Sequence, residues 1–356
     1  MAARTTYSMA DIARVAGVSK NTVSLALRGD PQIPPSTRER IAGIAQSMGY
    51  QKNATMAHLM AELRRTKKPR VQAAIALLNA NVDQEAFRRH PTVPAYIKGC
   101  RRRADELGYT MDEFWLHDPS LDGERLNKIL RARGIRGAIV VGLMRENILP
   151  AGFAETWAEF PVVVTGVRTR DPALSFACTD HHMLALRAFE QALALGYRRP
   201  ALVLDEEIDQ LVDGRFSAGV SVALRNRPAS ARTRPFYQVR EAMENPEIFA
   251  EWFAREKPDV LLTLYNVVRS WLRGMKLAVP DDVGLIQLEW RATSPEWAGM
   301  DQHNDVVGEA AVEMLISMIH RHEIGVPEFP RATLVGSTWK DGQTVRARSR
   351  RTVRKA

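Results

Sequence analysis

The chain has 356 residues, which is too long for one small domain and indicates two or three. Its content of 45% hydrophobic and 26% charged residues is typical of an ordinary globular protein, and no apolar run is long enough to span a membrane. The two cysteines are far apart and predict no disulfide framework, and the N-terminal stretch lacks the features of a signal peptide, so we expect a cytoplasmic protein.

The net charge of +9 is unevenly distributed. Residues 1–70 contain 12 Lys or Arg against 4 Asp or Glu, and residues 340–356 contain 7 against 1, whereas residues 71–339 contain 31 against 36. A basic head on a mildly acidic body favours a head that binds a polyanion. The basic tail over residues 346–356 is equally well explained as a solubilising end, so its contact with DNA stays open.

Residues 8–29, SMADIARVAGVSKNTVSLALRG, predict two short helices around a tight turn. Ser8 occupies the N-cap position of the first helix, and Gly17 ends it. Ser19 caps a second helix that stops at Gly29. This is the helix-turn-helix pattern, although a helical corner packed only for stability would look similar.

A third helix is expected over STRERIAGIAQSMG, residues 36–49, with Ser36 and Glu39 as a capping box. Its apolar stripe should complete a small core with the first two helices. The residues expected in that core are Ile12, Val15, Val23, Leu27, Ile41, Ile44, Ala45 and Met48.

Residues 54–64 form a further helical pattern, which Asn53 precedes and the charged run RRTKKPR follows. A short helix between two domains has little to pack against, so it should be mostly unfolded unless a partner stabilises it. We therefore expect a linker between the head and the body.

From residue 71 onward, apolar strands alternate with amphipathic helices. This alternation predicts parallel sheets covered on both faces, and its length predicts two doubly wound lobes. Ligands of such folds bind beyond the carboxyl ends of the strands, here in the cleft between the lobes. The expected strands are 71–78, 109–116, 137–143, 161–166, 201–206, 234–239, 259–264 and 283–290. The expected helices are 94–108, 123–134, 180–196, 215–227, 245–257, 267–278 and 305–325.

The chain resembles the LacI/GalR (lactose repressor) family over essentially its whole length. The resemblance rests on MADIARVAGVSKNTVSLALRG and PPSTRERIAGIAQSMGY in the head, and on RRRADELGY, ALGYRRPA, DGRFSAG and VPDDVGLI in the body. It implies an all-α helix-turn-helix domain over residues 1–52 and a hinge helix with linker over 53–70. A two-lobed, periplasmic-binding-protein-like α/β domain for effector binding and dimerisation would follow over 71–345, with a basic tail over 346–356.

The resemblance also implies which residues contact DNA. Lys20, Asn21 and Ser24 would read base edges in the major groove, and Thr22 would reach a phosphate. Leu25 stands where several family members have a basic residue, so the operator sequence of this protein need not match the operators of those members. Leu59 falls on the position of the leucine that wedges into the minor groove, although it could instead dock on the body when DNA is absent. The full set of implied DNA-binding residues is Ser8, Ser19, Lys20, Asn21, Thr22, Ser24, Leu25, Asn53, Met56 and Leu59.

For the effector, the resemblance points to six residues. Arg215 is the best-matched position, and its planar guanidinium suits hydroxyls or a carboxylate. Asn266 and Glu289 replace the family's frequent Asp residues, so a common hexose is not implied. Tyr265 and Trp290 flank them, and Gln302 lies near a crossing between the lobes.

No other chemistry is indicated. Cys178, His181 and His182 are too few to complete a metal site, and no catalytic or phosphate-binding motif stands out, so we expect neither metal, cofactor nor enzymatic activity. The leading hypothesis is a DNA-binding transcriptional regulator, with repression favoured. It would bind a pseudo-palindromic operator as a homodimer and respond to a small effector, such as a sugar or a related metabolite. The alternative is a cytoplasmic small-molecule-binding protein or enzyme with a non-functional head.

Overall fold

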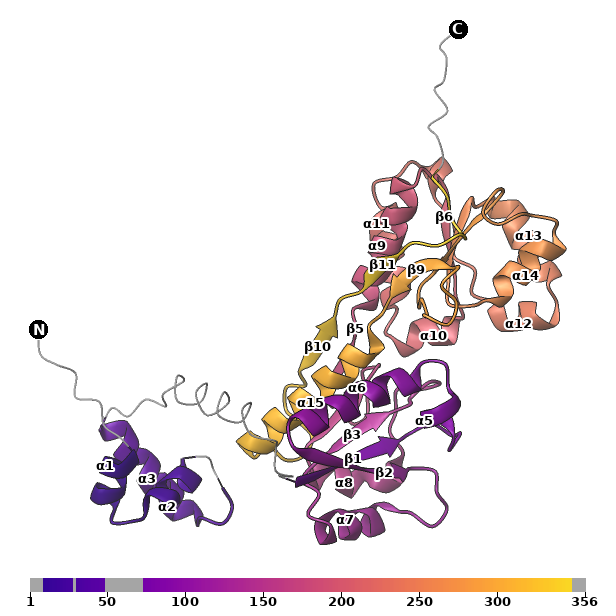
Figure 1. The fold of residues 1–356 in the computed structure, drawn as a ribbon. Helices are drawn as coiled ribbons and strands as arrows, with labels where there is room; N and C mark the ends of the chain where they lie inside the picture. The colour runs from indigo at the N-terminus through magenta and orange to yellow at the C-terminus, as the bar shows by residue number, and fades with distance from the viewer. Residues whose placement is uncertain (1–8, 28–29, 49–72, 348–356) are drawn as a thin grey trace, which may run out of the picture.

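The computed structural model describes residues 9–27, 30–48 and 73–347, which form a helical head and a two-lobed body (Figure 1). The predicted roles of Ser8, Asn53, Met56 and Leu59, the end of the second helix at Gly29 and the predicted hinge helix lie outside these residues. Most of the basic tail, residues 348–356, lies outside them as well.

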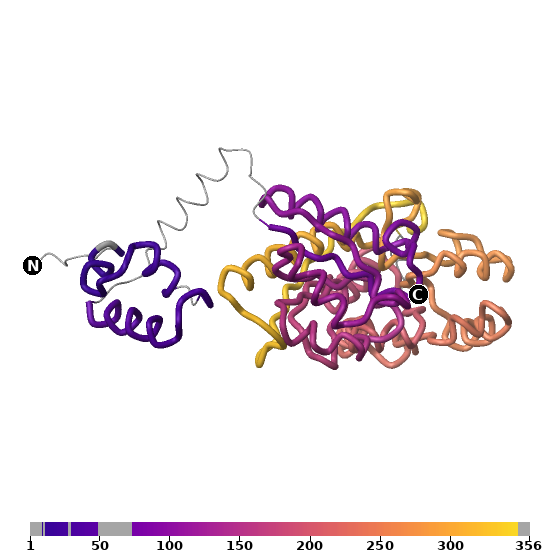
Figure 2. Tube along the Cα trace, turned by 90° about the horizontal axis from the view of Figure 1, so that it is seen from below, coloured from indigo at the N-terminus to yellow at the C-terminus, as the bar shows by residue number. Residues whose placement is uncertain are grey.

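The head consists of three short helices, α1 (Met9–Ala16), α2 (Lys20–Ala26) and α3 (Pro35–Ser47), which form one group in both views (Figures 1 and 2). Gly17 adopts a φ of 65°, which lets the chain turn sharply out of α1. The helices enclose a core centred on Ile12, Val23 and Ile41, each fully buried. The predicted helix-turn-helix is therefore confirmed.

Two details of the head differ from the sequence prediction. Val15 is 59% exposed, because the buried face of α1 is formed by Ile12, Ala13 and Ala16, three and four residues apart. Ser36 does not cap α3, because the helix already begins at Pro35, after Pro34. Proline lacks the N–H that the first helical turn leaves unbonded, so a helix can start there without a side-chain cap.

The body contains two sheets. Lobe 1 has six parallel strands in the order β10-β5-β4-β3-β1-β2, and lobe 2 has five in the order β11-β9-β8-β7-β6, with only β11 antiparallel. The strands of lobe 1 are β1 (Ala73–Asn79), β2 (Tyr109–Trp115), β3 (Ala138–Val141), β4 (Val162–Thr165), β5 (Ser175–Thr179) and β10 (Ala332–Val335). Those of lobe 2 are β6 (Pro200–Val203), β7 (Val260–Thr263), β8 (Gly284–Gln287), β9 (Ala298–Asp301) and β11 (Thr338–Lys340).

Helices cover both faces of each sheet, as predicted. In β1, Ile75 and Leu77 pack with α6 and α15, whereas Ala76 and Leu78 face the opposite cluster, which α7 and α8 help to cover. The helices of lobe 1 are α5 (Ala86–Arg89), α6 (Val93–Glu106), α7 (Gly123–Ala132), α8 (Ala154–Glu159) and α15 (Asn304–Arg321). Those of lobe 2 are α9 (His181–Ala194), α10 (Glu206–Leu211), α11 (Arg215–Leu224), α12 (Val239–Glu244), α13 (Glu247–Glu256) and α14 (Val267–Gly274). Two short 3-10 turns, Ala151–Phe153 and Ala229–Ala231, complete the elements.

The chain crosses between the lobes three times, after β5, after β9 and after β10 (Figure 1). The crossings are bonded to one another. The Thr179 hydroxyl donates to the main-chain oxygen of Gln302 over 3.2 Å, and the Asp180 main-chain N–H donates to the main-chain oxygen of Val335 over 2.9 Å. These bonds fix the three crossings, here called the waist, to one another.

One predicted strand is wrong, and several real strands were not expected. Residues 234–239 form no strand, because only Phe236 bridges to Val203 at the edge of the sheet before α12 begins at Val239. Strands β5, β9, β10 and β11 lie outside the expected set. Apart from β11, they are no shorter than several strands that were predicted, and pairing with neighbouring strands makes them extended.

Candidate functional site

Ser19 caps the N-terminal end of α2. The Ser19 hydroxyl accepts the main-chain N–H of Thr22 over 3.1 Å and lies 2.8 Å from the Thr22 hydroxyl. Val23 and Ala26 are buried on the inner side of α2, whereas Lys20 and Asn21 are exposed at its start. The start of a helix has free N–H groups and a partial positive charge, both of which suit an anionic partner.

The other predicted contacts of α2 are less open. Ser24 and Leu25 are half-buried, and the Thr22 hydroxyl already lies within hydrogen-bond distance of Ser19. Arg40, which the sequence analysis did not single out, donates from Nη1 to the main-chain oxygen of Ala16 over 2.9 Å. Because that oxygen is at the last residue of α1, Arg40 fixes α3 to the end of α1 and so supports the position of the turn before α2.

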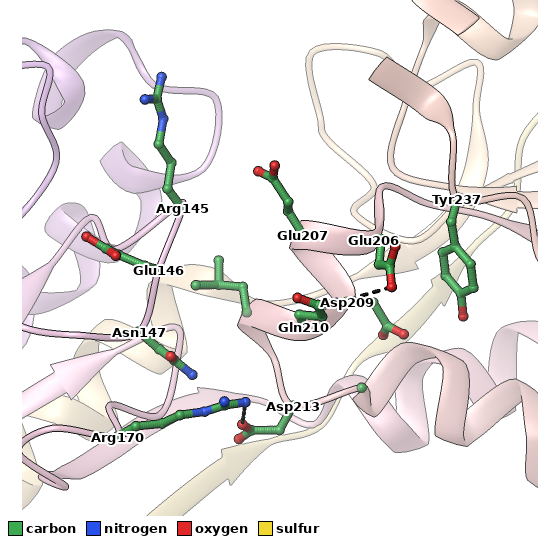
Figure 3. A pocket seen from close by; sticks show the side chains of 12 residues that line it. Arg145, Glu146, Asn147, Arg170, Glu206, Glu207, Asp209, Gln210, Asp213 and Tyr237 are labelled. Atoms are coloured by element: carbon green, nitrogen blue, oxygen red, sulfur yellow. Dashed lines mark hydrogen bonds and ion pairs between the residues drawn. The ribbon is translucent and has the colours of Figure 1, made fainter. Parts of the chain in front are cut away.

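A pocket of about 520 Å³ opens between the two lobes (Figure 3). Lobe 1 contributes Arg145, Glu146, Asn147 and Arg170. Lobe 2 contributes Tyr237 and seven residues of the segment from Glu206 to Gly214, which includes α10. The volume suits a small metabolite, and the walls come from the two lobes, as expected for an effector site of this fold.

None of the six predicted effector residues lines this pocket directly, although Arg215 follows the pocket residue Gly214. The Arg215 side chain turns toward lobe 1. Its Nε donates to the main-chain oxygen of Val212 over 2.7 Å, and its Nη1 lies 3.0 Å from the Cys178 sulfur at the end of β5. Its guanidinium also stands 6.0 Å from the centre of the Phe176 ring. Arg215 thus connects the start of α11 with the strand ends of lobe 1.

Glu289 and Gln302 lie beside the second crossing. Glu289 accepts from Asn304 Nδ2 over 3.1 Å and from Arg291 Nη2 over 2.7 Å. Gln302 donates from Nε2 to the main-chain oxygen of Leu288 over 2.9 Å. Both side chains therefore have protein partners, and they hold the connection from β9 to α15 against the end of β8.

The last three predicted residues also have protein partners. Asn266 accepts from Gln287 Nε2 over 2.5 Å, and the indole N–H of Trp290 donates to the main-chain oxygen of Trp297 over 3.0 Å. Burial, followed by the charge of Asp205, raises the pKa of Tyr265 to about 12. Apart from Arg215, the predicted residues therefore follow the ends of strands β7, β8 and β9 of lobe 2, and the contact of all six with an effector stays a prediction.

Several buried polar atoms in the body have no hydrogen-bond partner among the described residues. Among them are Arg215 Nη2, His181 Nδ1, Gln287 Oε1, Arg291 Nε and Asn147 Nδ2. Buried polar groups are nearly always bonded, so each such atom marks a place for water or a ligand. Of these residues, the sequence analysis proposed only Arg215 for the effector site. The others follow strands or begin helices, but no local motif distinguishes them.

His181 and Tyr96 are two further buried titratable groups. His181 is 5% exposed and its ring centre is 4.8 Å from that of Phe216. Burial, followed by the charge of Arg215, lowers the pKa of His181 to about 3, so its imidazole is neutral at physiological pH. Burial raises the pKa of Tyr96, and the nearby Glu289 and Cys178 add to the shift.

Other site types find no support in the described part of the chain. No group of three His, Cys, Asp or Glu residues there is arranged to hold a metal ion, and Cys178 and His181 have the contacts given above. Cys100 and Cys178 are both buried, free thiols. Within the same residues, no helix combines the length and the apolar character needed to cross a membrane.

Comparisons with known proteins agree with this arrangement. Residues 8–53 match the bacterial regulatory proteins of the lacI family, and residues 189–344 match a periplasmic binding protein-like domain. The chain is 26% identical over 196 residues to the HTH-type transcriptional regulator CelR of Thermobifida fusca, a match that covers 54% of each protein. It is 25% identical over 335 residues to the HTH-type transcriptional regulator PtxS of Pseudomonas plecoglossicida, covering 90% of this chain and 92% of that protein.

The chain thus spans about half the length of several curated relatives that it matches, CelR among them. Its fold is that of the lac repressor dimer bound to operator and the anti-inducer ONPF, with a TM-score of 0.56, 16% identity, and coverage of 96% of this chain and 100% of that one. CelR and PtxS are transcriptional regulators and not enzymes, in agreement with the prediction from the sequence. The head thus matches the lacI family of bacterial regulatory proteins, the body matches a periplasmic binding protein-like domain, and the relatives that the chain resembles are HTH-type transcriptional regulators.

Proposed function

We propose that this protein is a DNA-binding transcriptional regulator that represses its target genes. It binds a pseudo-palindromic operator as a homodimer, and a small molecule held between its lobes controls that binding. The observation that carries the proposal is a capped helix, α2, with Lys20 and Asn21 exposed at its start, in a chain whose body has a pocket between two lobes. The proposal places the protein in the cytoplasm, where operator DNA is accessible.

At the operator, each α2 of the dimer enters the major groove of one half-site. Lys20, Asn21 and Ser24 contact base edges, with Thr22, Ser19 and Ser8 near the phosphates. Leu25 offers only apolar contact, for example to a thymine methyl. The hinge segment supplies Asn53, Met56 and Leu59, with Leu59 as the minor-groove wedge.

In the body, the effector acts by binding one arrangement of the lobes more tightly than the other. The hydrogen bonds between the crossings make the waist a suitable transmitter, because any change of lobe angle must move the ends of β5, β9 and β10 together. Arg215 supports this role, since it already connects α11 of lobe 2 with Cys178 of lobe 1. Tyr265, Asn266, Glu289, Trp290 and Gln302 complete the proposed set of effector-responsive residues.

Fluorescence anisotropy with a labelled duplex from upstream of the protein's own gene tests the DNA-binding step. We expect affinity about a thousandfold or more above that for a scrambled duplex, with a steep fall as salt increases. Asn21→Ala should reduce the specific affinity. Gln32→Ala, which removes an exposed amide elsewhere on the head, is the matched control and should leave it unchanged. Equal affinity for operator and scrambled duplex would refute the proposal.

Deleting residues 1–62 separates this function from that of a ligand-binding protein or enzyme with an inactive head. A regulator loses control of its target genes when the head is removed, which transcript measurements in the host would show. If the truncated protein restored the phenotype of a deletion strain, the body alone would carry the function.

A further inference from the structure

The two walls of the pocket between the lobes differ in charge (Figure 3). The wall from lobe 2 carries four carboxylates, Glu206, Glu207 and Asp209 on α10 and Asp213 just before α11. The wall from lobe 1 mixes both signs, with Arg145, Glu146, Asn147 and Arg170. Most of the other lining side chains are charged or carry an amide, and Leu211 and the ring of Tyr237 add apolar surface. A ligand of this pocket must therefore offer polar or charged groups to these side chains.

Protein cations already balance two of the four carboxylates. Arg170 Nη2 is 3.1 Å from Asp213 Oδ1, an ion pair that connects the two lobes. Arg240 Nη2 is 2.5 Å from Glu207 Oε2. Both ion pairs satisfy groups at the edge of the pocket, so neither of these carboxylates needs a cationic ligand.

Glu206 and Asp209 differ from Glu207 and Asp213, because neither forms an ion pair with an arginine among the described residues. Glu206 accepts from Gln210 Nε2 over 3.2 Å, and Asp209 accepts from the main-chain N–H of Ser217 over 3.2 Å. Among the described residues, no lysine, arginine or histidine forms an ion pair with either one. Asp209 is only 6% exposed, and a buried carboxylate without a cation is costly. Asp209 also shares a side-chain hydrogen bond with the Tyr237 hydroxyl, a neutral partner, and its charge contributes, after burial, to a raised pKa of Tyr237.

A second observation comes from the opposite wall. Asn147 is 8% exposed, and its Nδ2 has no partner among the described residues. Its main-chain oxygen accepts from the Arg170 N–H over 2.9 Å, which fixes the residue in place. Figure 3 shows its amide extending from lobe 1 toward the lobe 2 wall. An amide N–H in this position can donate to an oxygen acceptor of a ligand.

We propose that the pocket binds a small hydroxylated amine in its ammonium form, such as an amino sugar or an amino alcohol. The ammonium group lies against Asp209 and Glu206, and a hydroxyl or carbonyl oxygen accepts from Asn147 Nδ2. A neutral polyol would leave Asp209 without a cation, and an anion would face the carboxylates of α10. This inference rests on the proposed function, since it names the class of effector that the regulator senses.

Isothermal titration of the full-length protein without DNA tests the ligand class. Glucosamine, glucose and gluconate share one carbon chain and carry an ammonium, a neutral group and a carboxylate, and galactosamine, mannosamine and ethanolamine extend the amine series. We expect at least one amine to bind about tenfold or more tightly than glucose, and gluconate not to bind. Tighter binding of glucose or gluconate, or no binding by any of the amines, would overturn the proposal.

Variants locate the bound amine. Asp209→Asn should remove the preference for the amine over the neutral sugar. Glu206→Gln, at an exposed position, should weaken that preference, and it serves as the test if Asp209→Asn does not fold. Asn147→Ala should weaken the binding of the amine and of the neutral sugar to a similar extent. Glu251→Gln, an exposed position on α13 outside the pocket, is the matched control. An unchanged preference in Glu206→Gln and in a folded Asp209→Asn would place the amine elsewhere.

Operator binding by the same protein samples separates the two proposals. Specific operator binding without any amine binding would refute the proposed ligand class but not the proposed regulatory function. Amine binding without specific operator binding would refute the proposed regulatory function but not the proposed ligand class.

Discussion

At the scale of single residues, the neutral, buried His181 makes stability depend on pH. Its pKa of about 3 in the folded protein lies below the ordinary value of 6.5. The unfolded chain therefore takes up a proton as pH falls below about 6.5, whereas the folded protein does not, and the stabilisation present above pH 6.5 is progressively lost. His90, whose pKa is also lowered, chiefly by burial, acts in the same direction.

We predict that His181→Gln flattens this dependence. The variant should be less stable than the wild type at pH 8, because it loses the contact with Phe216. Between pH 6.5 and 4, its free energy of unfolding should fall less steeply, by up to about 1.4 kcal/mol per pH unit. Urea titrations of both proteins at a series of pH values measure the two slopes, and parallel curves would contradict the prediction.

Arg215 belongs to the same scale, because one side chain reaches from α11 to the end of β5. We predict that Arg215→Ala abolishes the response to effector while leaving operator affinity nearly unchanged. A reporter strain measures the response, and anisotropy with the purified protein measures the affinity. Arg215→Lys keeps the charge but not the planar fork, so a partial response is expected from it. A normal response in Arg215→Ala would show that Arg215 does not take part in the response to effector.

At the scale of elements, α6 and α15 approach each other closely through two glycines. A Cβ at Gly99 would lie 1.8 Å from the main-chain oxygen of Asp305, and one at Gly308 would lie 2.2 Å from that of Tyr96. Main-chain atoms cannot move aside as the end of a flexible side chain can. Any larger residue at either position must therefore push the two helices apart.

We predict that Gly99→Ala lowers the stability of the body by about 1–3 kcal/mol, the usual cost of overpacking. Gly274→Ala is the matched control, since a Cβ there meets nothing within 4 Å. It should be neutral or slightly stabilising, because alanine favours the helix. Thermal or urea unfolding of both variants gives the comparison, and equal stabilities would show that α6 and α15 adjust without cost.

At the scale of the whole molecule, the proposed function joins a head that binds DNA to a body that binds a metabolite. Leu59→Ala tests the connecting segment. We predict weaker specific operator binding, because the minor-groove wedge and the DNA bend that it allows are lost, while ligand binding to the body stays intact. Anisotropy and calorimetry on the same preparation measure both, and unchanged operator affinity would remove the wedge role.

The sequence alone determined the elements whose signals are local. Ser19 caps α2 and Gly17 ends α1 as predicted, because a cap or a left-handed turn depends on only a few neighbouring residues. The two doubly wound lobes followed from the alternation of apolar strands and helices, which reflects burial on both faces of each sheet. Strand β10 was not predicted, since it is extended through its pairing with β5, which is distant in the sequence.

Only the tertiary structure decided which residues meet at the sites. Val15 is apolar but exposed, because the packing of three helices, and not its own character, selects the buried face of α1. Asn147 and Asp209 face one pocket only because the loop after β3 and the helix after β6 come from different lobes that the three crossings hold together. Sequence periodicity carries the short-range constraints of helices and strands. The composition of a pocket between two lobes depends on contacts between segments far apart in the chain, and those exist only once the lobes have folded.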